Sequence, residues 1–153
     1  MEQDLSRTLH TLTARLDRGA DALLRDEAGM SYSRFLALFM IGSFGADTQR
    51  VLAQRLGVTE PSASRMTRVL ADTGLVQVIP DPAGGHRHQL RLTASGAQLV
   101  HAWGGLLEER LAALVESAGV PYGTYLKYTK RVLERLDAQP AAARASSPGR
   151  MSR

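Results

Sequence analysis

The chain has 153 residues, of which 44% are hydrophobic, and a formal net charge of +4, values typical of one globular domain rather than of a disordered chain. The absence of cysteine excludes disulfides, thiolate metal ligands and a thiol-oxidation switch. No apolar run reaches the roughly 20 residues of a membrane-spanning helix, and the N-terminus lacks the basic start and apolar stretch of a secretory signal, so we expect a cytoplasmic protein.

Apart from the last 16 residues, which add +3, the positive charge of the chain lies in its middle third. Residues 1–47 carry a net charge of −2, whereas residues 48–93, with six arginines and three acidic residues, carry +3. Of the 19 basic residues, 17 are arginine, whose planar donor fork suits phosphates and guanine edges. A G+C-rich genome that prefers arginine codons explains the same count, so the arginine content by itself does not decide the function.

The first quarter of the chain contains two predicted helices. Leucines at helical spacing predict one over about residues 4–27. Ser31 is a suitable N-cap for a second helix over residues 32–43, which is apolar nearly all round and should be buried. Gly42 and Gly45 are expected to end it.

Two shorter helices follow. The third is predicted from about Thr48 to Gly57, a glycine placed to end a helix in the left-handed conformation. Thr59 then caps a fourth helix that runs to about Thr73, with Pro61 in its first turn, where a missing N–H costs nothing.

The rest of the chain is predicted as a hairpin and two helices. Residues 75–79 and 89–92 have the composition and alternation of strands, and the residues between them favour turns. A long helix over about residues 94–117 and a last helix over residues 122–137 carry many apolar positions, more than a domain of this size covers alone.

Two short helices and a hairpin in this order describe a winged helix-turn-helix. A major groove about 12 Å wide admits one helix, which a second must brace across the backbone, so we expect the helix after Thr59 to recognise DNA. Helical periodicity places on one of its sides Thr59, Ser62, Ala63, Met66, Val69 and Leu70. The other side offers two arginines one turn apart, Arg65 and Arg68, with Pro61, Ser64 and Asp72. The predicted contacts with bases and phosphates are Thr59, Pro61, Ser62, Ser64, Arg65 and Arg68, with Arg50 of the preceding helix. For the arginines, ordinary solvated surface is the alternative.

The segment from Phe35 to Gly96, with VLAQRLGVTEPSASRMTRVLADTGLV at its centre and RLTASG at its end, resembles the MarR family of bacterial transcription regulators. The L-A-x-x-L-G-V-T part is shared by many helix-turn-helix proteins. Its combination with L-x-x-x-G-L-V before the first strand and L-T-x-x-G after the second is far more specific. With the helices on either side, the resemblance covers about residues 5–137.

The resemblance implies a mainly α fold with a small β-hairpin wing. Residues 31–93 would form the winged helix-turn-helix DNA-binding region, and residues 1–30 with 94–138 a helical dimerisation region. Residues 139–153 are expected to be a disordered basic tail.

The wing tip departs from the family pattern, which places an acid and two arginines in a D-x-x-D-R-R arrangement. Here Gly84 and Gly85 replace the second acid and the first arginine, and His86 stands at the other arginine's place. Arg87, displaced by one position, is expected to reach the minor groove with His86 beside it. Strand alternation could instead point Arg87 away from DNA.

The resemblance also implies a homodimer on a pseudo-palindromic operator with half-sites about 10 bp apart, released when a small aromatic or anionic effector binds. The candidate effector residues are Arg15, Arg18, His10, Tyr32, Phe39 and Trp103. A surface ion-pair network with Asp17 and Asp21 is the alternative for the two arginines. Core packing is the alternative for Phe39 and Trp103, and polar helix surface or dimer packing is the alternative for His10.

Two other functions are weighed against this interpretation. One is a winged-helix module for DNA architecture or protein interaction, without an effector. The other is a metal sensor or metalloenzyme that uses His86 and His88, near which the sequence has no carboxylate cluster. Nothing resembles a nucleophile elbow, a phosphate-binding loop or a nucleotide fingerprint, so we expect neither enzymatic activity nor a cofactor.

Overall fold

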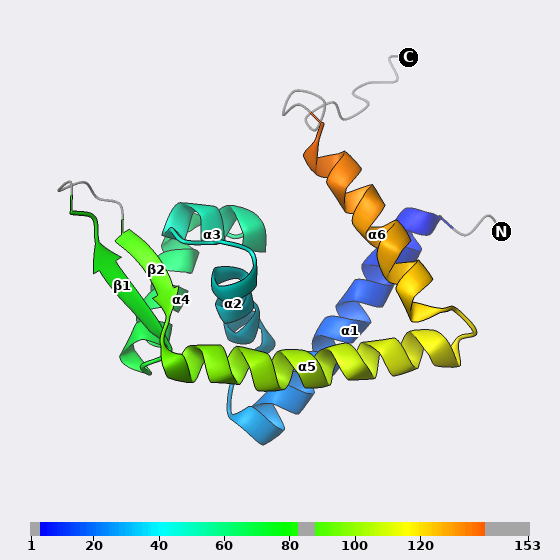
Figure 1. The fold of residues 1–153 in the computed structure, drawn as a ribbon, viewed down its shortest axis with the longest axis horizontal. Helices are drawn as coiled ribbons and strands as arrows, with labels where there is room; N and C mark the ends of the chain where they lie inside the picture. The colour runs from blue at the N-terminus through cyan, green and yellow to red at the C-terminus, as the bar shows by residue number, and fades with distance from the viewer. Residues whose placement is uncertain (1–3, 83–87, 140–153) are drawn as a thin grey trace, which may run out of the picture. The chain divides into compact units, whose positions relative to one another are not determined.

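The computed structural model describes residues 4–82 and 88–139 of the chain. These residues form six helices and one two-stranded antiparallel hairpin (Figure 1), which confirms the predicted mainly helical fold class with a small β-hairpin. In chain order the elements are α1 (Leu5–Ala28), α2 (Tyr32–Ser43), α3 (Gln49–Leu56), α4 (Glu60–Asp72), β1 (Val76–Pro80), β2 (His88–Leu92), α5 (Ala94–Ser117) and α6 (Tyr122–Asp137).

The chain divides into two compact units, residues 1–107 and residues 108–153. The first unit holds the first four helices, the hairpin and the start of α5, and the second holds the end of α5 and all of α6. Among the described residues, no helix is both long enough and apolar enough to cross a membrane.

Side chains at the N-termini fix the starts of the first four helices. Asp4, Ser31, Thr48 and Thr59 each accept a hydrogen bond from a backbone N–H two or three residues further on. Each cap satisfies one of the donors left free at a helix start. The caps predicted at Ser31 and Thr59 are therefore confirmed.

Helix α2 ends at Ser43, as predicted, with Gly45 just beyond it in the left-handed conformation (φ 62°), but Gly42 does not end the helix. The helix continues through Gly42 to Ser43, and Phe44 follows as the cap residue, its N–H donating to the carbonyl of Met40. Gly42 lies inside the helix against β2, where an added Cβ would come within 2.6 Å of the Cδ1 atom of Leu92. Packing rather than helix termination therefore explains the small residue.

The core of the first unit is built around α2, which contacts α1, α3, α4 and β2. Its Phe35, Ala37, Leu38 and Ile41 are buried, and the burial of such apolar surface is the main force that holds the elements together. The other buried core residues are Leu24, Met30, Ala46, Leu52, Leu70, Val76, Leu90 and Val100. Helices α3 and α4 and the hairpin therefore rest on one common support.

The hairpin is attached to this support along one face. β1 and β2 pair with Val76 opposite Leu92, and Val76 and Leu90 are buried. The N–H of Leu90 also donates to the carbonyl of Asp47, just before α3, over 2.7 Å. The strands are thus fixed beside the two helices of the helix-turn-helix.

The start of α5 packs tightly against the chain segment that leaves α4. The hydroxyl of Thr93 donates to the carbonyl of Gly74 (2.7 Å) and accepts from the N–H of Gly96 (3.1 Å). An added Cβ at Gly96 would lie 2.1 Å from the carbonyl oxygen of Leu75, so only glycine allows this approach. The L-T-x-x-G segment therefore joins the hairpin to α5.

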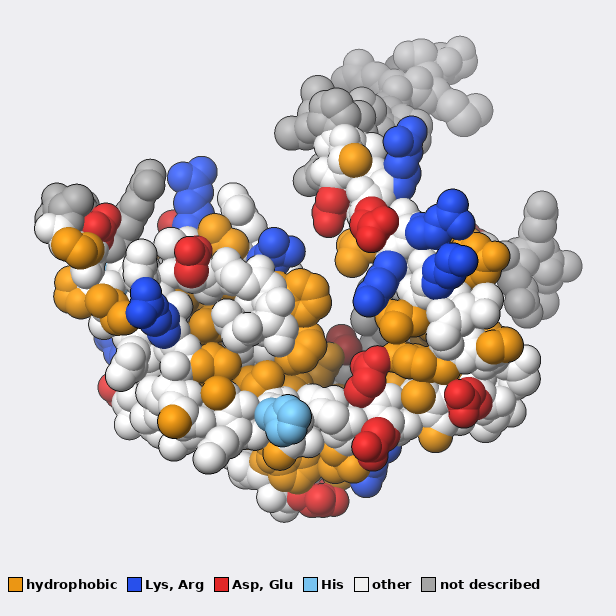
Figure 2. All heavy atoms as spheres, in the orientation of Figure 1, with side chains coloured by type: hydrophobic (Ala, Val, Ile, Leu, Met, Phe, Trp, Pro, Cys, Tyr) orange, Lys and Arg blue, Asp and Glu red, His pale blue; other side chains and the backbone are white. Residues whose placement is uncertain are grey.

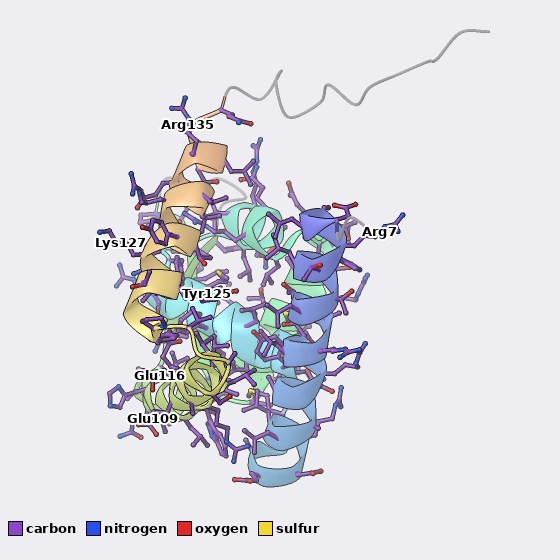
Figure 3. The ribbon with its side chains drawn as sticks, turned by 90° about the vertical axis from the view of Figure 1, so that its right-hand side faces the viewer. Arg7, Glu109, Glu116, Tyr125, Lys127 and Arg135 are labelled. Atoms are coloured by element: carbon purple, nitrogen blue, oxygen red, sulfur yellow. The ribbon has the colours of Figure 1, made fainter. Side chains whose placement is uncertain are left out.

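In the second unit, α6 is amphipathic and contains no buried residue. Its first residue, Tyr122, is hydrogen-bonded through its hydroxyl to the carboxylate of Glu108. Basic side chains gather over α6 in the space-filling view (Figure 2). Figure 3 shows Lys127 leaving α6 on the side opposite Tyr125, as their spacing on a helix requires.

Candidate nucleic-acid interface

Residues close together in the sequence determine how α4 leaves α3. Gly57 has a φ of 66°, a left-handed conformation that glycine adopts without steric strain. Thr59 then caps α4 by accepting from the N–H of Ser62 over 3.3 Å, and Pro61 occupies a first-turn position that needs no N–H. The turn and the cap predicted from the sequence are both present.

The inner side of α4 is formed by Ala63, Thr67 and Leu70, which are buried. Thr67 satisfies its hydroxyl by donating to the carbonyl of Ala63 over 2.7 Å. Met66, predicted to lie on the same side, is only half-buried. The buried stripe is thus centred nearer Thr67, whose spacing of four residues from Ala63 and three from Leu70 indicates the same side of a helix.

The opposite side of α4 is exposed and contains both predicted arginines. Neither arginine forms an ion pair within the described residues, so their guanidinium groups are open to an outside acceptor. Of the predicted contacts on this helix, Thr59, Pro61, Arg65 and Arg68 are exposed, whereas Ser62 and Ser64 are half-buried. Their exposure is compatible with DNA contact and with a solvated helix surface alike.

Three of the predicted contacts are hydrogen-bonded to one another at the start of α4. The hydroxyl of Thr59 donates to Ser62 Oγ over 3.0 Å. Arg65 donates to the same oxygen through Nη2 over 3.1 Å. The structure therefore joins Thr59, Ser62 and Arg65 into one network, which we call the Thr59–Ser62–Arg65 network.

Other basic side chains lie on the elements next to α4. Arg50 and Arg55 are exposed on α3, and Arg91 is exposed on β2, opposite Gln77 of β1. Over α3 and the hairpin, the basic side chains stand apart from one another in Figure 2. Arg91 is not among the predicted contacts, although its place next to the buried Leu90 in an alternating strand is the signal for an outward side chain.

The wing tip falls in residues 83–87, outside the described part of the chain. The predicted minor-groove contacts His86 and Arg87 therefore stay predictions. His88, the first residue of β2, is exposed. Over residues 4–82 and 88–139, no group of three or more histidine, aspartate and glutamate side chains is placed to hold a metal ion.

The polar residues predicted for an effector are exposed on α1. They are His10, Arg15 and Arg18. The ion-pair network expected as their alternative is not formed in the described structure. There, Asp21 pairs instead with Arg25, at 2.6 Å.

Asp21 links α1 to the start of α2. One carboxylate oxygen accepts from the N–H of Tyr32 (2.8 Å) and the other from Nε of Arg25 (2.6 Å). The hydrogen bond from Arg25, assisted by that from Tyr32, lowers the pKa of Asp21. Burial raises the pKa of the Tyr32 hydroxyl, and the negative charge of Asp17 acts in the same direction.

The aromatic residues predicted for the effector, Tyr32, Phe39 and Trp103, are half-buried and pack against the core. Tyr32 and Phe35 stack with their ring centroids 6.4 Å apart, and Phe35 and Phe39 stack at 6.2 Å. Phe39 in turn lies 5.5 Å from the ring of Phe44. This row of rings agrees with the alternative of core packing.

These elements define a winged helix-turn-helix fold, in which α4 is the second helix of the helix-turn-helix. Residues 28–86 match the model of the MarR family. A helix-turn-helix transcriptional regulator of Mycobacterium bovis is 38% identical over 95 residues, which are 58% of this chain and 64% of the relative. The match thus spans just under two thirds of that curated relative's length.

Solved structures with the same fold cover most of the chain. The multiple antibiotic resistance repressor MarR is 25% identical with a TM-score of 0.69, over 87% of this chain and 97% of its own. MepR of Staphylococcus aureus, solved in complex with DNA, is 21% identical with a TM-score of 0.69, over 90% and 100%. A MarR family protein of Mycobacterium tuberculosis, solved with salicylic acid, is 24% identical with a TM-score of 0.65, over 88% and 97%.

The match of residues 28–86 to the model of the MarR family confirms the resemblance stated from the sequence. The members of that family are transcription regulators, which agrees with the expectation that the chain is not an enzyme.

Proposed function

We propose that the protein is a sequence-specific DNA-binding transcription regulator that acts as a repressor in the cytoplasm. The observation that supports this function is the exposed side of α4, a helix braced by α3 that presents Arg65 and Arg68 without ion-pair partners in the described structure. A groove-binding helix needs such donors for phosphates and base edges. MepR, with the same fold, was solved bound to DNA, which supports the same use of the fold here.

In this proposal, residues 31–93 form the DNA-binding region. The contacts on α4 and its neighbours come from Thr59, Pro61, Ser62, Ser64, Arg65, Arg68 and Arg50, with His86 and Arg87 of the wing. Residues 1–30 and 94–138 form the dimerisation region.

The dimer is supported by apolar side chains that each unit leaves exposed. On α1, Leu5 is 70% exposed and Leu9 48%. On α6, Val132 is 70% exposed and Leu133 54%. Such stripes of apolar surface on a chain of this size are typical of an interface, and two-fold symmetry is the most common way to bury them.

The regulator is also proposed to release DNA when a small aromatic anion binds. The arginines of α1, Arg15 and Arg18, would supply positive charge, and His10, Tyr32, Phe39 and Trp103 would supply the remaining contacts. A relative with this fold was solved with salicylic acid, which makes salicylate a suitable probe. Salicylate should lower the affinity of the protein for its operator, and Arg15→Ala should reduce that effect. If salicylate leaves the affinity unchanged, salicylate is not an effector of this protein.

The DNA-binding function is tested by footprinting the purified protein on the DNA directly upstream of its own gene. We expect a protected, pseudo-palindromic site, with two half-sites about 10 bp apart. The double variant Arg65→Ala/Arg68→Ala should lose this protection while its thermal unfolding stays unchanged. If the protein instead binds scrambled DNA as strongly as the operator, and rising salt weakens both complexes equally, the alternative of a winged-helix module for DNA architecture is favoured.

A further inference from the structure

We infer that Ser62 is a specificity-determining residue, which holds Arg65 in position to recognise a guanine in each operator half-site. The inference rests on the proposed DNA-binding function and adds to it the base that is recognised and the residue that positions the contact. It starts from the hydrogen bonds of the Thr59–Ser62–Arg65 network.

The network fixes which hydrogen bonds remain to be made. A serine hydroxyl can accept two hydrogen bonds and donate one. Ser62 Oγ already accepts from Thr59 Oγ1 (3.0 Å) and from Arg65 Nη2 (3.1 Å). Both of its acceptor positions are thus used, and Ser62 can only donate its hydroxyl proton to an outside group.

Arg65 is restricted in the same way. Its guanidinium group has N–H donors and no acceptor. One of these donors is hydrogen-bonded to Ser62, and Arg65 forms no ion pair within the described residues. The edge formed by Ser62 and Arg65 therefore offers donors only, and it selects a partner that offers acceptors only.

Among the four bases, guanine fits this requirement best. Its major-groove edge has two neighbouring acceptors, O6 and N7, whereas adenine places a donor beside its N7, cytosine offers a donor, and thymine has a single acceptor next to a methyl group. Phosphate oxygens are acceptors too, but they carry no sequence information. The test must therefore separate a guanine contact from a phosphate contact.

Arg68 provides the comparison within the same helix. It is exposed one turn further along α4, and no side-chain hydrogen bond of Arg68 occurs in the described structure. An arginine that is already held in place loses less conformational freedom on binding than a free one. Removal of the Ser62 hydroxyl should therefore weaken the contact made by Arg65 and leave that of Arg68 unchanged.

The experiment begins with selection of binding sites from random DNA by the full-length protein. We expect at least one fixed guanine in each half-site. At that guanine, Arg65→Ala should lower the preference over adenine by about 5- to 100-fold, the range of one bidentate contact. Ser62→Ala should lower this preference for guanine by about 5-fold, and Ser62→Thr should restore part of the loss because it keeps a hydroxyl. In all three variants, the affinity for random DNA should change by less than about 2-fold.

A double-mutant cycle then tests whether Ser62 acts through Arg65. Ser62→Ala should keep its full effect in the Arg68→Ala background and have no further effect in the Arg65→Ala background. Replacement of the selected guanine by 7-deazaguanine, which lacks N7, should weaken binding of the wild type and not of Arg65→Ala. Ser117→Ala, a serine change in α5, serves as the control for handling and folding.

The outcomes separate the two proposals. If Ser62→Ala and Arg65→Ala weaken specific and random DNA by the same factor, the network contacts phosphate and the inference is overturned. The same holds if the effect of Ser62→Ala persists in the Arg65→Ala background. If the wild-type protein selects no sequence at all, the proposed function itself fails, irrespective of these variants.

Discussion

Arg68 shows what a single side chain is expected to contribute on the exposed side of α4. Because it has no partner in the described structure, Arg68→Ala should leave the free energy of unfolding within about 0.5 kcal/mol of the wild type. Operator affinity should fall by about 1–3 kcal/mol if Arg68 contacts a base. Fluorescence anisotropy with a labelled operator measures the change, with Arg110→Ala, an exposed arginine of α5, as the matched control. Equal affinity in both variants would mean that Arg68 belongs to the solvated surface.

We expect Asp21 to contribute to the stability of the fold. Its carboxylate accepts hydrogen bonds from Arg25 and from the N–H of Tyr32, which together lower its pKa from the ordinary value of 3.8. A carboxyl group with a lowered pKa stabilises the folded state above its ordinary pKa, and this contribution is lost as the pH falls through the lower value. Asp21→Asn should therefore unfold at a lower temperature than the wild type at pH 7.

Asp26, on the same helix, provides the control for Asp21. The difference in unfolding temperature between the wild type and Asp21→Asn should shrink as the pH is lowered from about 4 to 2.5, because the wild-type carboxyl group becomes protonated. Asp26→Asn removes a carboxylate from an exposed position of the same helix and should show no such trend. A difference for Asp21→Asn that is constant from pH 7 to pH 2.5 would show that ionisation of this group does not contribute.

At the scale of elements, the join between the hairpin and α5 is the most constrained contact. A methyl group at Gly96 would meet the backbone of Leu75 at 2.1 Å, and backbone cannot rotate away as a flexible side chain does. Gly96→Ala should therefore destabilise the fold by about 1–3 kcal/mol, measured by urea unfolding. Gly105→Ala in the same helix meets nothing within 4 Å and should be neutral or stabilise by up to about 1 kcal/mol. Equal stability of the two variants would contradict the tight join.

The elements that sequence reasoning predicted well are those fixed by neighbouring residues. Ser31 and Thr59 cap helices through bonds that span three residues, and Gly57 ends α3 through its own backbone conformation. Such signals are contained in a few consecutive residues, so the order of helices and strands could be predicted together with most of their bounds.

What could not be predicted depends on residues far apart in the chain. Gly42 packs against Leu92 of β2, whose Cδ1 atom an added Cβ would approach to 2.6 Å, a contact that exists only once the hairpin has paired. In the site, the exposure of Arg65 and Arg68 follows from helical periodicity. The Thr59–Ser62–Arg65 network does not, because it depends on which rotamers the three side chains adopt.

At the scale of the whole molecule, the remaining question is how the apolar surface of each unit is covered. The side chains of α6 sort into an apolar and a charged side, and Tyr128, Val132 and Leu136 are all more than half exposed. A chain that left such a stripe in water would be prone to association. In a two-fold symmetric DNA-binding protein, each half-site needs its own recognition helix. Dimerisation through this apolar surface would therefore be required for operator binding.

Leu133→Glu tests this requirement. Leu133 is 54% exposed on α6, so a charge there should leave the fold of the chain intact, as judged by circular dichroism, yet disfavour an apolar interface. We expect twice the chain mass for the wild type by light scattering and the single chain mass for the variant, with loss of operator binding because one half-site alone binds weakly. Lys127→Glu introduces the same charge on the opposite, polar side of the helix (Figure 3) and should remain dimeric. A wild-type protein that is monomeric at micromolar concentration, or a Leu133→Glu variant that keeps both its mass and its affinity, would exclude α6 from the interface.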